Sequence, residues 1–163
     1  MRHNPPSTLK GGKIIVTGSV IGLYSFPVFP EGASAKAASL HWVWSMAPML
    51  RHENITINTV LPNGYVTGAM SDSRAAYLDE HLTTKECLLN AYDLFLNDRY
   101  NERTGQAVEA AHDQHYFHNE PDYKSGSVIE RTVTPYEPWF IRMHGAPSGL
   151  EHSIKGPLRV EKE

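Results

Sequence analysis

The sequence predicts an α/β protein built on a parallel sheet of about three strands. Three short runs rich in β-branched and apolar residues occupy 13–18, 54–61 and 105–110, and such runs are typical of buried parallel strands. Between them, residues 31–52 and 73–98 carry apolar side chains at helical spacing. The order strand, helix, strand, helix, strand favours right-handed crossovers and therefore a parallel sheet.

The first helix is apolar on two sides. Its two stripes are Leu40, Val43, Ala47 and Leu50, and Ala38, Trp42, Met46 and Met49. A helix of this kind packs on two neighbours; we expect the sheet to be one of them, and a second chain is a candidate for the other. Pro48 removes a backbone hydrogen bond, which predicts a kink near Trp44.

The second strand alternates over 54–61 and ends at Pro62-Asn63-Gly64. After Ala111 the periodicity fades, and we expect an extended C-terminal tail that folds over the surface with Trp139 and Phe140 as anchors. The predicted organisation is an N-terminal segment (1–12), an α/β domain (13–111) and a C-terminal extension packed on it (112–163).

Composition and charge limit the kinds of partner and compartment that we expect for this chain. A chain of 163 residues suits one domain, and its net charge of −3 gives no reason to expect a nucleic acid or an anionic membrane as partner. The single cysteine, Cys87, excludes an intrachain disulfide and fits a reducing compartment; we expect it to be a small buried apolar side chain. No secretory signal or bilayer-spanning run is evident, so we expect a cytoplasmic protein.

Three histidines, His112, His115 and His118, invite comparison with a metal site. Side chains three residues apart lie on opposite faces of a strand. In a helix, side chains at this spacing turn gradually away from a single face. No carboxylate or cysteine lies at a standard ligand spacing from them. We therefore expect no metal here, and favour a histidine-rich turn from which one imidazole could still act as a general acid or base.

Three positions at fixed spacing follow the first strand. Ser19 comes directly after the strand, Gly32 lies thirteen residues later and Lys36 four further on. This pattern resembles the active site of the short-chain dehydrogenase/reductase family, in which a serine ends a strand and a tyrosine and a lysine follow at the same spacings. Glycine stands here at the position of the tyrosine.

Further segments carry the same resemblance. Residues 58–67 (NTVLPNGYVT) are similar to the family motif in which Pro-Gly ends a strand and a nearby threonine contacts the nicotinamide. Asn63 replaces the glycine, and we expect it to accept left-handed backbone. Residues 105–109 (GQAVE) are similar to the family's last strand, and 138–150 to the C-terminal extension of fungal members related to hydroxyprostaglandin dehydrogenases.

The resemblance implies the C-terminal half of a Rossmann-like fold, without the family's glycine-rich nucleotide-binding half. In the family the serine holds the substrate oxygen, and the lysine lowers the pKa of the tyrosine and binds the cofactor ribose. Gly32 cannot transfer a proton, and no GxGxxG motif precedes the first strand. We therefore expect no bound cofactor and no hydride transfer by the family's mechanism.

A pocket beyond the carboxyl ends of the strands is the part of the site that we expect to remain. The expected catalytic residues are Ser19, Lys36 and Tyr65, and the expected substrate-binding residues are Tyr24, Gly32, Asn63, Gly64 and Thr67. Glycine in place of tyrosine should open space there. Lys36 would face this cavity as a base or as a stabiliser of an enolate, or would be a relic paired with a carboxylate. Tyr24 and Tyr65 are candidates for the missing acid, with pocket lining as their plainer role.

Three functions remain open. The first is a cofactor-independent lyase, isomerase or cyclase, catalysing an aldol, dehydration or pericyclic reaction on a polyketide- or terpenoid-like molecule, for which the resemblance implies fungal secondary metabolism. The second is a non-catalytic pseudoenzyme that binds a small molecule or a reductase subunit. The third is an NAD(P)-dependent oxidoreductase completed by another chain.

The first strand also predicts self-association. In the family the sheet continues beyond this strand, so 13–18 is expected to be an exposed apolar edge here, which is an aggregation liability unless it is covered. Residues 1–9 or a second copy of the chain could cover it, and we expect a homodimer.

Overall fold

The computed structural model describes residues 11–68 and 74–157, and the chain divides into two compact units after Asn119. The helices and strands of the first unit are, in chain order, β1 (Gly12–Thr17), α1 (Pro30–Leu50), β2 (Ile55–Pro62), α2 (Lys85–Leu96), β3 (Ala107–Ala111) and β4 (Gln114–His118). Short 3-10 turns stand between them: η1 (Val20–Gly22), η2 (Arg51–Glu53) and η4 (Asp79–His81).

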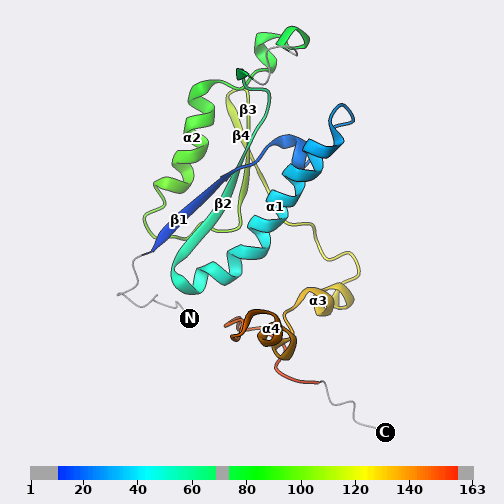
Figure 1. Ribbon diagram of the computed structural model, residues 1–163. Helices are drawn as coiled ribbons and strands as arrows, with labels where there is room; N and C mark the ends of the chain where they lie inside the picture. The colour runs from blue at the N-terminus through cyan, green and yellow to red at the C-terminus, as the bar shows by residue number, and fades with distance from the viewer. Residues whose placement is uncertain (1–10, 69–73, 158–163) are drawn as a thin grey trace. The chain divides into compact units, whose positions relative to one another are not determined.

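The sheet has the strand order β1-β2-β3-β4 (Figure 1). β1, β2 and β3 are parallel, with Ile14 opposite Ile57 and Val60 opposite Val108. This confirms the predicted parallel sheet and α/β class. β2 is buried almost throughout because it is the strand with a parallel neighbour on each side.

The helices α1 and α2 cover opposite faces of the sheet (Figure 1). Alternate residues of β2 serve the two faces: Ile57 and Leu61 pack with residues of α1, and Val60 packs with α2. The α2 face is a cluster of small and apolar side chains around Phe95, which is 1% exposed. The core therefore lies on both sides of the central strands, leaving their carboxyl ends for a site.

The fourth strand corrects the predicted boundary of the α/β unit at Ala111. β4 pairs antiparallel with β3, with Val108 opposite Phe117, so residues 114–118 belong to the sheet and not to an extended tail. The hairpin turns through His112, whose backbone has a positive φ of 51°. Left-handed turns usually carry Gly, Asn or Asp, which is why this hairpin leaves little trace in the sequence.

The first helix runs through Pro48 to Leu50 and then tightens into η2. Asn54 ends that turn in the left-handed conformation, at a φ of 56°. Of the second apolar stripe, Trp42 is 50% exposed. Within 11–68 and 74–157, no helix is long and apolar enough to cross a bilayer.

The second unit contains two helices, α3 (Ser127–Val133) and α4 (Glu137–His144), where an extended tail was expected. A single β-bridge pairs Tyr136, just before α4, with Ile154. The carboxylate of Glu137 accepts hydrogen bonds from the backbone N–H and the hydroxyl of Ser148, which ties the start of α4 to the following loop.

Candidate functional site

Ser19 lies where β1 ends and the turn η1 begins. Its hydroxyl accepts a hydrogen bond from the backbone N–H of Ile21 over 3.4 Å, so the serine caps the turn. The turn packs directly on α1: a Cβ added to Gly22 would lie 2.6 Å from the backbone carbon of Lys36. Only glycine permits this approach, and the approach brings Ser19 and Lys36 to the same strand end.

Lys36 reaches back to the strand that carries the serine. Its ammonium donates a hydrogen bond to the backbone carbonyl of Thr17 over 3.2 Å, two residues before Ser19. This contact places the charged head of Lys36 at the carboxyl end of β1. The partner of Lys36 is thus a backbone carbonyl, where one of the expected alternatives was a carboxylate.

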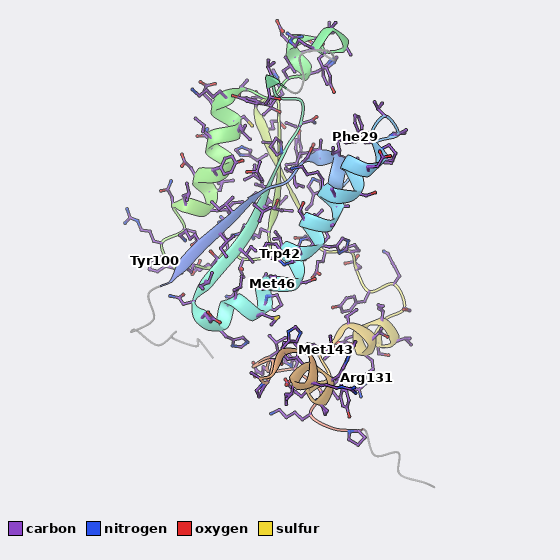
Figure 2. All side chains as sticks on the ribbon, viewed as in Figure 1. Phe29, Trp42, Met46, Tyr100, Arg131 and Met143 are labelled. Atoms are coloured by element: carbon purple, nitrogen blue, oxygen red, sulfur yellow. The ribbon has the colours of Figure 1, made fainter. Side chains whose placement is uncertain are left out.

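Gly32 does not open space at the site, contrary to expectation. The ring of Phe29 covers it: a Cβ at position 32 would lie 2.3 Å from two carbons of that ring. Phe29 is itself 54% exposed and stands at the start of α1, in the loop labelled in Figure 2. The phenyl ring of Phe29, which has no acidic proton, therefore occupies the place where a side chain at position 32 would begin.

The end of β2 differs from expectation in its backbone. Asn63 does not have a positive φ; instead its side-chain oxygen accepts a hydrogen bond from the N–H of Gly64 over 2.8 Å. The ring of Tyr77 packs on Gly64, 3.1 Å from where a Cβ would stand. A Cβ at position 64 would therefore press on the ring of Tyr77, and Asn63 holds the turn with its side chain.

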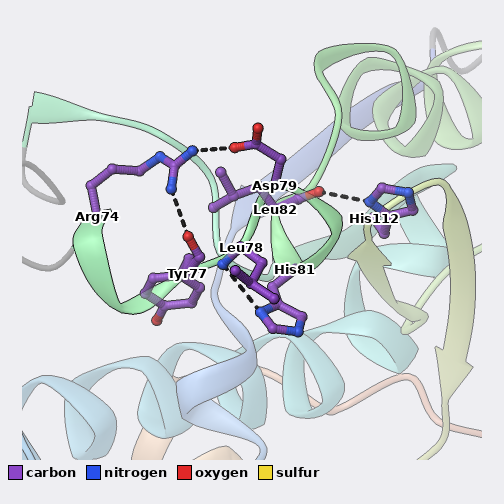
Figure 3. A network of polar contacts seen from close by, with 7 residues as sticks. All are labelled: Arg74, Tyr77, Leu78, Asp79, His81, Leu82 and His112. Carbon is purple, nitrogen blue, oxygen red and sulfur yellow. Dashed lines mark hydrogen bonds and ion pairs between the residues drawn. The ribbon is translucent and has the colours of Figure 1, made fainter.

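A polar network holds the segment that follows (Figure 3). Arg74 donates to the carbonyl of Tyr77 over 2.7 Å and pairs with Asp79. His112, in the β3–β4 turn, bonds the carbonyl of Leu82 over 3.1 Å. This network fixes Tyr77, and through its ring Gly64, beside the hairpin end of the sheet.

Tyr65 and Thr67 are two further expected site residues, and they follow the end of β2. Tyr65 is half-buried and Thr67 is exposed. Within the described part of the chain, no hydrogen bond joins either of them to Ser19 or Lys36. Their roles as catalytic and substrate-binding residues stay predictions.

A group of three titratable side chains, Tyr24, Glu109 and His118, lies on the α1 side of β3, and of these only Glu109 was not expected from the sequence. Glu109 is 7% exposed, and one of its oxygens, Oε2, accepts a hydrogen bond from the hydroxyl of Tyr24 over 3.0 Å and bonds Nε2 of His118 over 2.8 Å. The rings of Tyr24 and His118 meet edge to face at 6.1 Å. The sequence did contain a signal for Glu109, because a glutamate inside the apolar strand AVEAA needs a polar partner if it is buried.

This group changes the expected role of Tyr24. Desolvation raises the pKa of its phenol, and the hydrogen bond to Glu109 and the charge of that carboxylate raise it further. A phenol with a raised pKa is a weaker acid, whereas the family's tyrosine has its pKa lowered by the lysine. Tyr24 is therefore poorly suited to replace the missing acid, and serves as a neutral hydrogen-bond donor.

The three histidines considered for metal binding form hydrogen bonds to three different parts of the fold. His112 bonds Leu82, His115 bonds the carbonyl of Cys87 on α2 over 2.8 Å, and His118 bonds Glu109 on the other face of the sheet. Cys87 is buried, as expected. Burial raises the pKa of its thiol, and the charge of Asp113 raises it further, which favours a packing role.

Sequence similarity places this chain in a known family. The short-chain dehydrogenase family model matches residues 6–78. A curated protein of Penicillium rubens, short-chain dehydrogenase/reductase prx6, is 35% identical over 156 residues, which are 94% of this chain and 51% of that protein. The chain belongs to the short-chain dehydrogenase/reductase family, and it spans about half the length of this relative.

Solved structures agree on the fold. ElxO with bound NADP matches 60% of this chain and 44% of its own, with a TM-score of 0.52 and 21% identity. An acetoin dehydrogenase from Enterobacter cloacae matches 62% of this chain and 42% of its own, with a TM-score of 0.52 and 23% identity. Both support the Rossmann-like α/β architecture.

Proposed function

We propose that this chain catalyses proton transfer without a nicotinamide cofactor, as a lyase, isomerase or cyclase acting on a small carbonyl compound. One observation carries the proposal: the ring of Phe29 lies over Gly32, where the family's acid would be attached. Hydride transfer to a carbonyl needs a proton donor at the carbonyl oxygen, and neither glycine nor phenylalanine can supply one.

Ser19 and Lys36 support a site that still binds a carbonyl oxygen. The turn η1 rests on the backbone of Lys36 at Gly22, so the serine is held in place without any help from position 32. A hydroxyl and an ammonium at one strand end can stabilise an enolate oxygen, and enolates form in aldol, dehydration and isomerisation chemistry.

Glu109 and His118 supply acid–base chemistry of the required kind. A carboxylate only accepts hydrogen bonds, so the ring nitrogen of His118 that faces Glu109, Nε2, carries the proton. The other nitrogen, Nδ1, then has a lone pair that can take a proton, and the carboxylate stabilises the resulting imidazolium. The side chain of His118 is 23% exposed, so water and solutes reach it.

The proposed step is removal of a proton from a carbon next to the substrate carbonyl. The C–H proton moves to Nδ1 of His118, and the electron pair of that bond forms the enolate. Ser19 and Lys36 hold the enolate oxygen. Tyr24 belongs to the loop that follows Ser19, and its bond to Glu109 keeps the carboxylate aimed at the imidazole.

The first test is native mass spectrometry of the full chain with NAD, NADP and a metabolite extract of its source. Retention of a small carbonyl compound without nucleotide supports the proposal and supplies the substrate for kinetic work. Retention of NAD or NADP by the chain alone contradicts it.

The second test follows α-proton exchange of that compound in D₂O by NMR. His118→Gln should slow exchange by about 10²-fold or more, the usual contribution of a general base. The matched control is His115→Gln, in the same strand but bonded to Cys87 on the other face; its exchange rate should match that of the unchanged chain. Equal rates in His118→Gln and His115→Gln would remove His118 from the mechanism.

An NAD(P)-dependent reductase completed by another chain is the second candidate, favoured by the position of β1. Of the strands in the described part of the chain, β1 is at the edge of the sheet, so a partner can add strands beside it. Nucleotide binding that requires a second protein, together with substrate-dependent loss of NADPH absorbance, would support this candidate. A non-catalytic binding protein is the third candidate, and it gains support if Ser19→Ala and Lys36→Ala leave ligand binding unchanged.

A further inference from the structure

The second unit has a hollow of about 370 Å³ lined by α3, the loop that follows it, α4 and Ile154. Its wall is mostly aromatic and apolar, with Tyr136, Trp139, Phe140 and Met143 contributing. Pockets that bind small molecules begin at about 300 Å³ and have walls of this kind, with a few polar groups that orient the ligand. The hollow is therefore large enough for a compact aromatic molecule.

The wall is unusually open to solvent for such side chains. Trp139 is 64% exposed and Met143 is 65% exposed. Both belong to α4, and Met143 is labelled with Arg131 in Figure 2. An exposed group of large apolar side chains around a depression marks a binding surface, because isolated exposed residues do not gather in this way.

Charge indicates what the surface would bind. Arg131 lines the hollow, and within the described residues its guanidinium has no hydrogen-bond or ion-pair partner. None of the lining residues is acidic. The only other ionisable side chain with a basic nitrogen in the lining is His144, whose ring lies 4.3 Å from that of Phe140. The hollow thus combines an aromatic wall with an unpaired positive charge.

We propose that this hollow binds a small amphipathic carboxylate, with its aromatic or apolar body against Trp139 and its carboxylate on Arg131. A guanidinium can hold a carboxylate through two parallel hydrogen bonds, which an alcohol or an amine cannot reproduce. The site lies in a different unit from Ser19 and His118, so the proposal stands independently of the reaction assigned to them.

The test is isothermal titration calorimetry of the full chain with three ligands that share one body: 4-phenylbutyrate, 4-phenylbutanol and 4-phenylbutylammonium. We expect saturable binding of the acid, at least about fivefold tighter than that of the alcohol, and the weakest binding for the amine. Trp139→Ala should weaken the acid and the alcohol together, because both share the aromatic contact.

Two arginine variants test the charge. Arg131→Met should abolish the preference for the acid over the alcohol. The matched control is Arg142→Met, which removes an exposed arginine of α4 that does not line the hollow, and it should keep the preference.

Three outcomes would overturn the proposal. One is the absence of saturable binding of the acid, and another is a preference for the acid that survives Arg131→Met. The third is occupation of the hollow by a second copy of the chain, seen as a dimer in light scattering that Trp139→Glu converts to a monomer.

Discussion

The hydroxyl of Tyr24 donates a hydrogen bond to Oε2 of Glu109 over 3.0 Å, joining an exposed loop side chain to a nearly buried carboxylate in β3. Because the same oxygen also bonds His118, one buried acceptor holds both the loop after Ser19 and the β4 hairpin. The contact therefore connects two segments that are far apart in the sequence and that both bear on the proposed chemistry.

Tyr24→Phe should destabilise the chain at neutral pH and have little effect at high pH. The pKa of Tyr24 is raised in the folded state, so its contribution is complete below the unfolded value of about 10 and is lost as pH rises through the folded value. Tyr24 is 54% exposed, so the loss at pH 7 should be about 1 kcal/mol or less. Urea unfolding of both chains from pH 7 to pH 11 measures this, and a difference that does not shrink above pH 10 would contradict it.

Gly22→Ala should be much more destabilising than Gly32→Ala. The added Cβ at position 22 meets the backbone of Lys36, which cannot move alone, whereas at position 32 it meets the ring of Phe29, which is exposed and can rotate away. We expect a cost of about 1–3 kcal/mol at position 22. At position 32 the better helix propensity of alanine offsets the displaced ring, so the change should be within about 1 kcal/mol. Thermal unfolding of the two variants measures the difference, and equal costs would argue against the packing of η1 on α1.

Glu137→Gln should destabilise the second unit near neutral pH but not in acid. The hydrogen bond from the hydroxyl of Ser148 is the largest cause that lowers the pKa of Glu137; bonds from Ser153 and from the backbone of Ser148 add to it. A lowered folded pKa gives stability that is present above the unfolded value of about 4.3 and is lost as pH falls through the folded value.

Fluorescence of Trp139, isolated by replacing Trp42 and Trp44 with phenylalanine, reports on this unit. Glu130→Gln, in α3, is the control for loss of one carboxylate. If Glu137→Gln and Glu130→Gln behave alike from pH 3 to pH 7, the buried contact to Ser148 contributes nothing to stability.

A homodimer that joins through β1 remains a prediction. Among residues 11–68 and 74–157, β1 has a strand on one side only, and Ile14 in it is 38% exposed. Light scattering should show a dimer, and Ile14→Lys should shift it to a monomer, because charge on an edge strand disfavours pairing. Leu89→Lys, on α2 and also exposed, should leave the dimer intact. A monomer at every concentration would contradict the prediction.

The parallel core was predictable because its signals are local. The run KIIVTG and the alternating NITINTVL have lengths and compositions that few structures other than buried strands accommodate, and the residues between them repeat at helical spacing. β4 was missed because its residues, QHYFH, are polar or aromatic, and because its turn uses His112 in place of the usual glycine.

The location of the candidate site was easier to predict from the sequence than the side chains that form it. The resemblance to the family's active-site spacing predicted Ser19 and Lys36 at one strand end, where the structure has the ammonium of Lys36 bonded to Thr17. What covers Gly32 depends on the rotamer of Phe29, three residues away, which no pattern encodes. The pairing of Glu109 with Tyr24 and His118 depends on hairpin register and on a loop path, both of which are set by tertiary packing.

The close contact of Gly22 with the backbone of Lys36 separates the architecture of this site from its chemistry. The turn that carries the serine is positioned by main-chain atoms of Lys36, which a substitution at position 32 would not remove. Exchange of the residue at that position can therefore alter reactivity while the surrounding scaffold persists. Scaffold and chemistry can thus evolve separately at this strand end, because they depend on different residues.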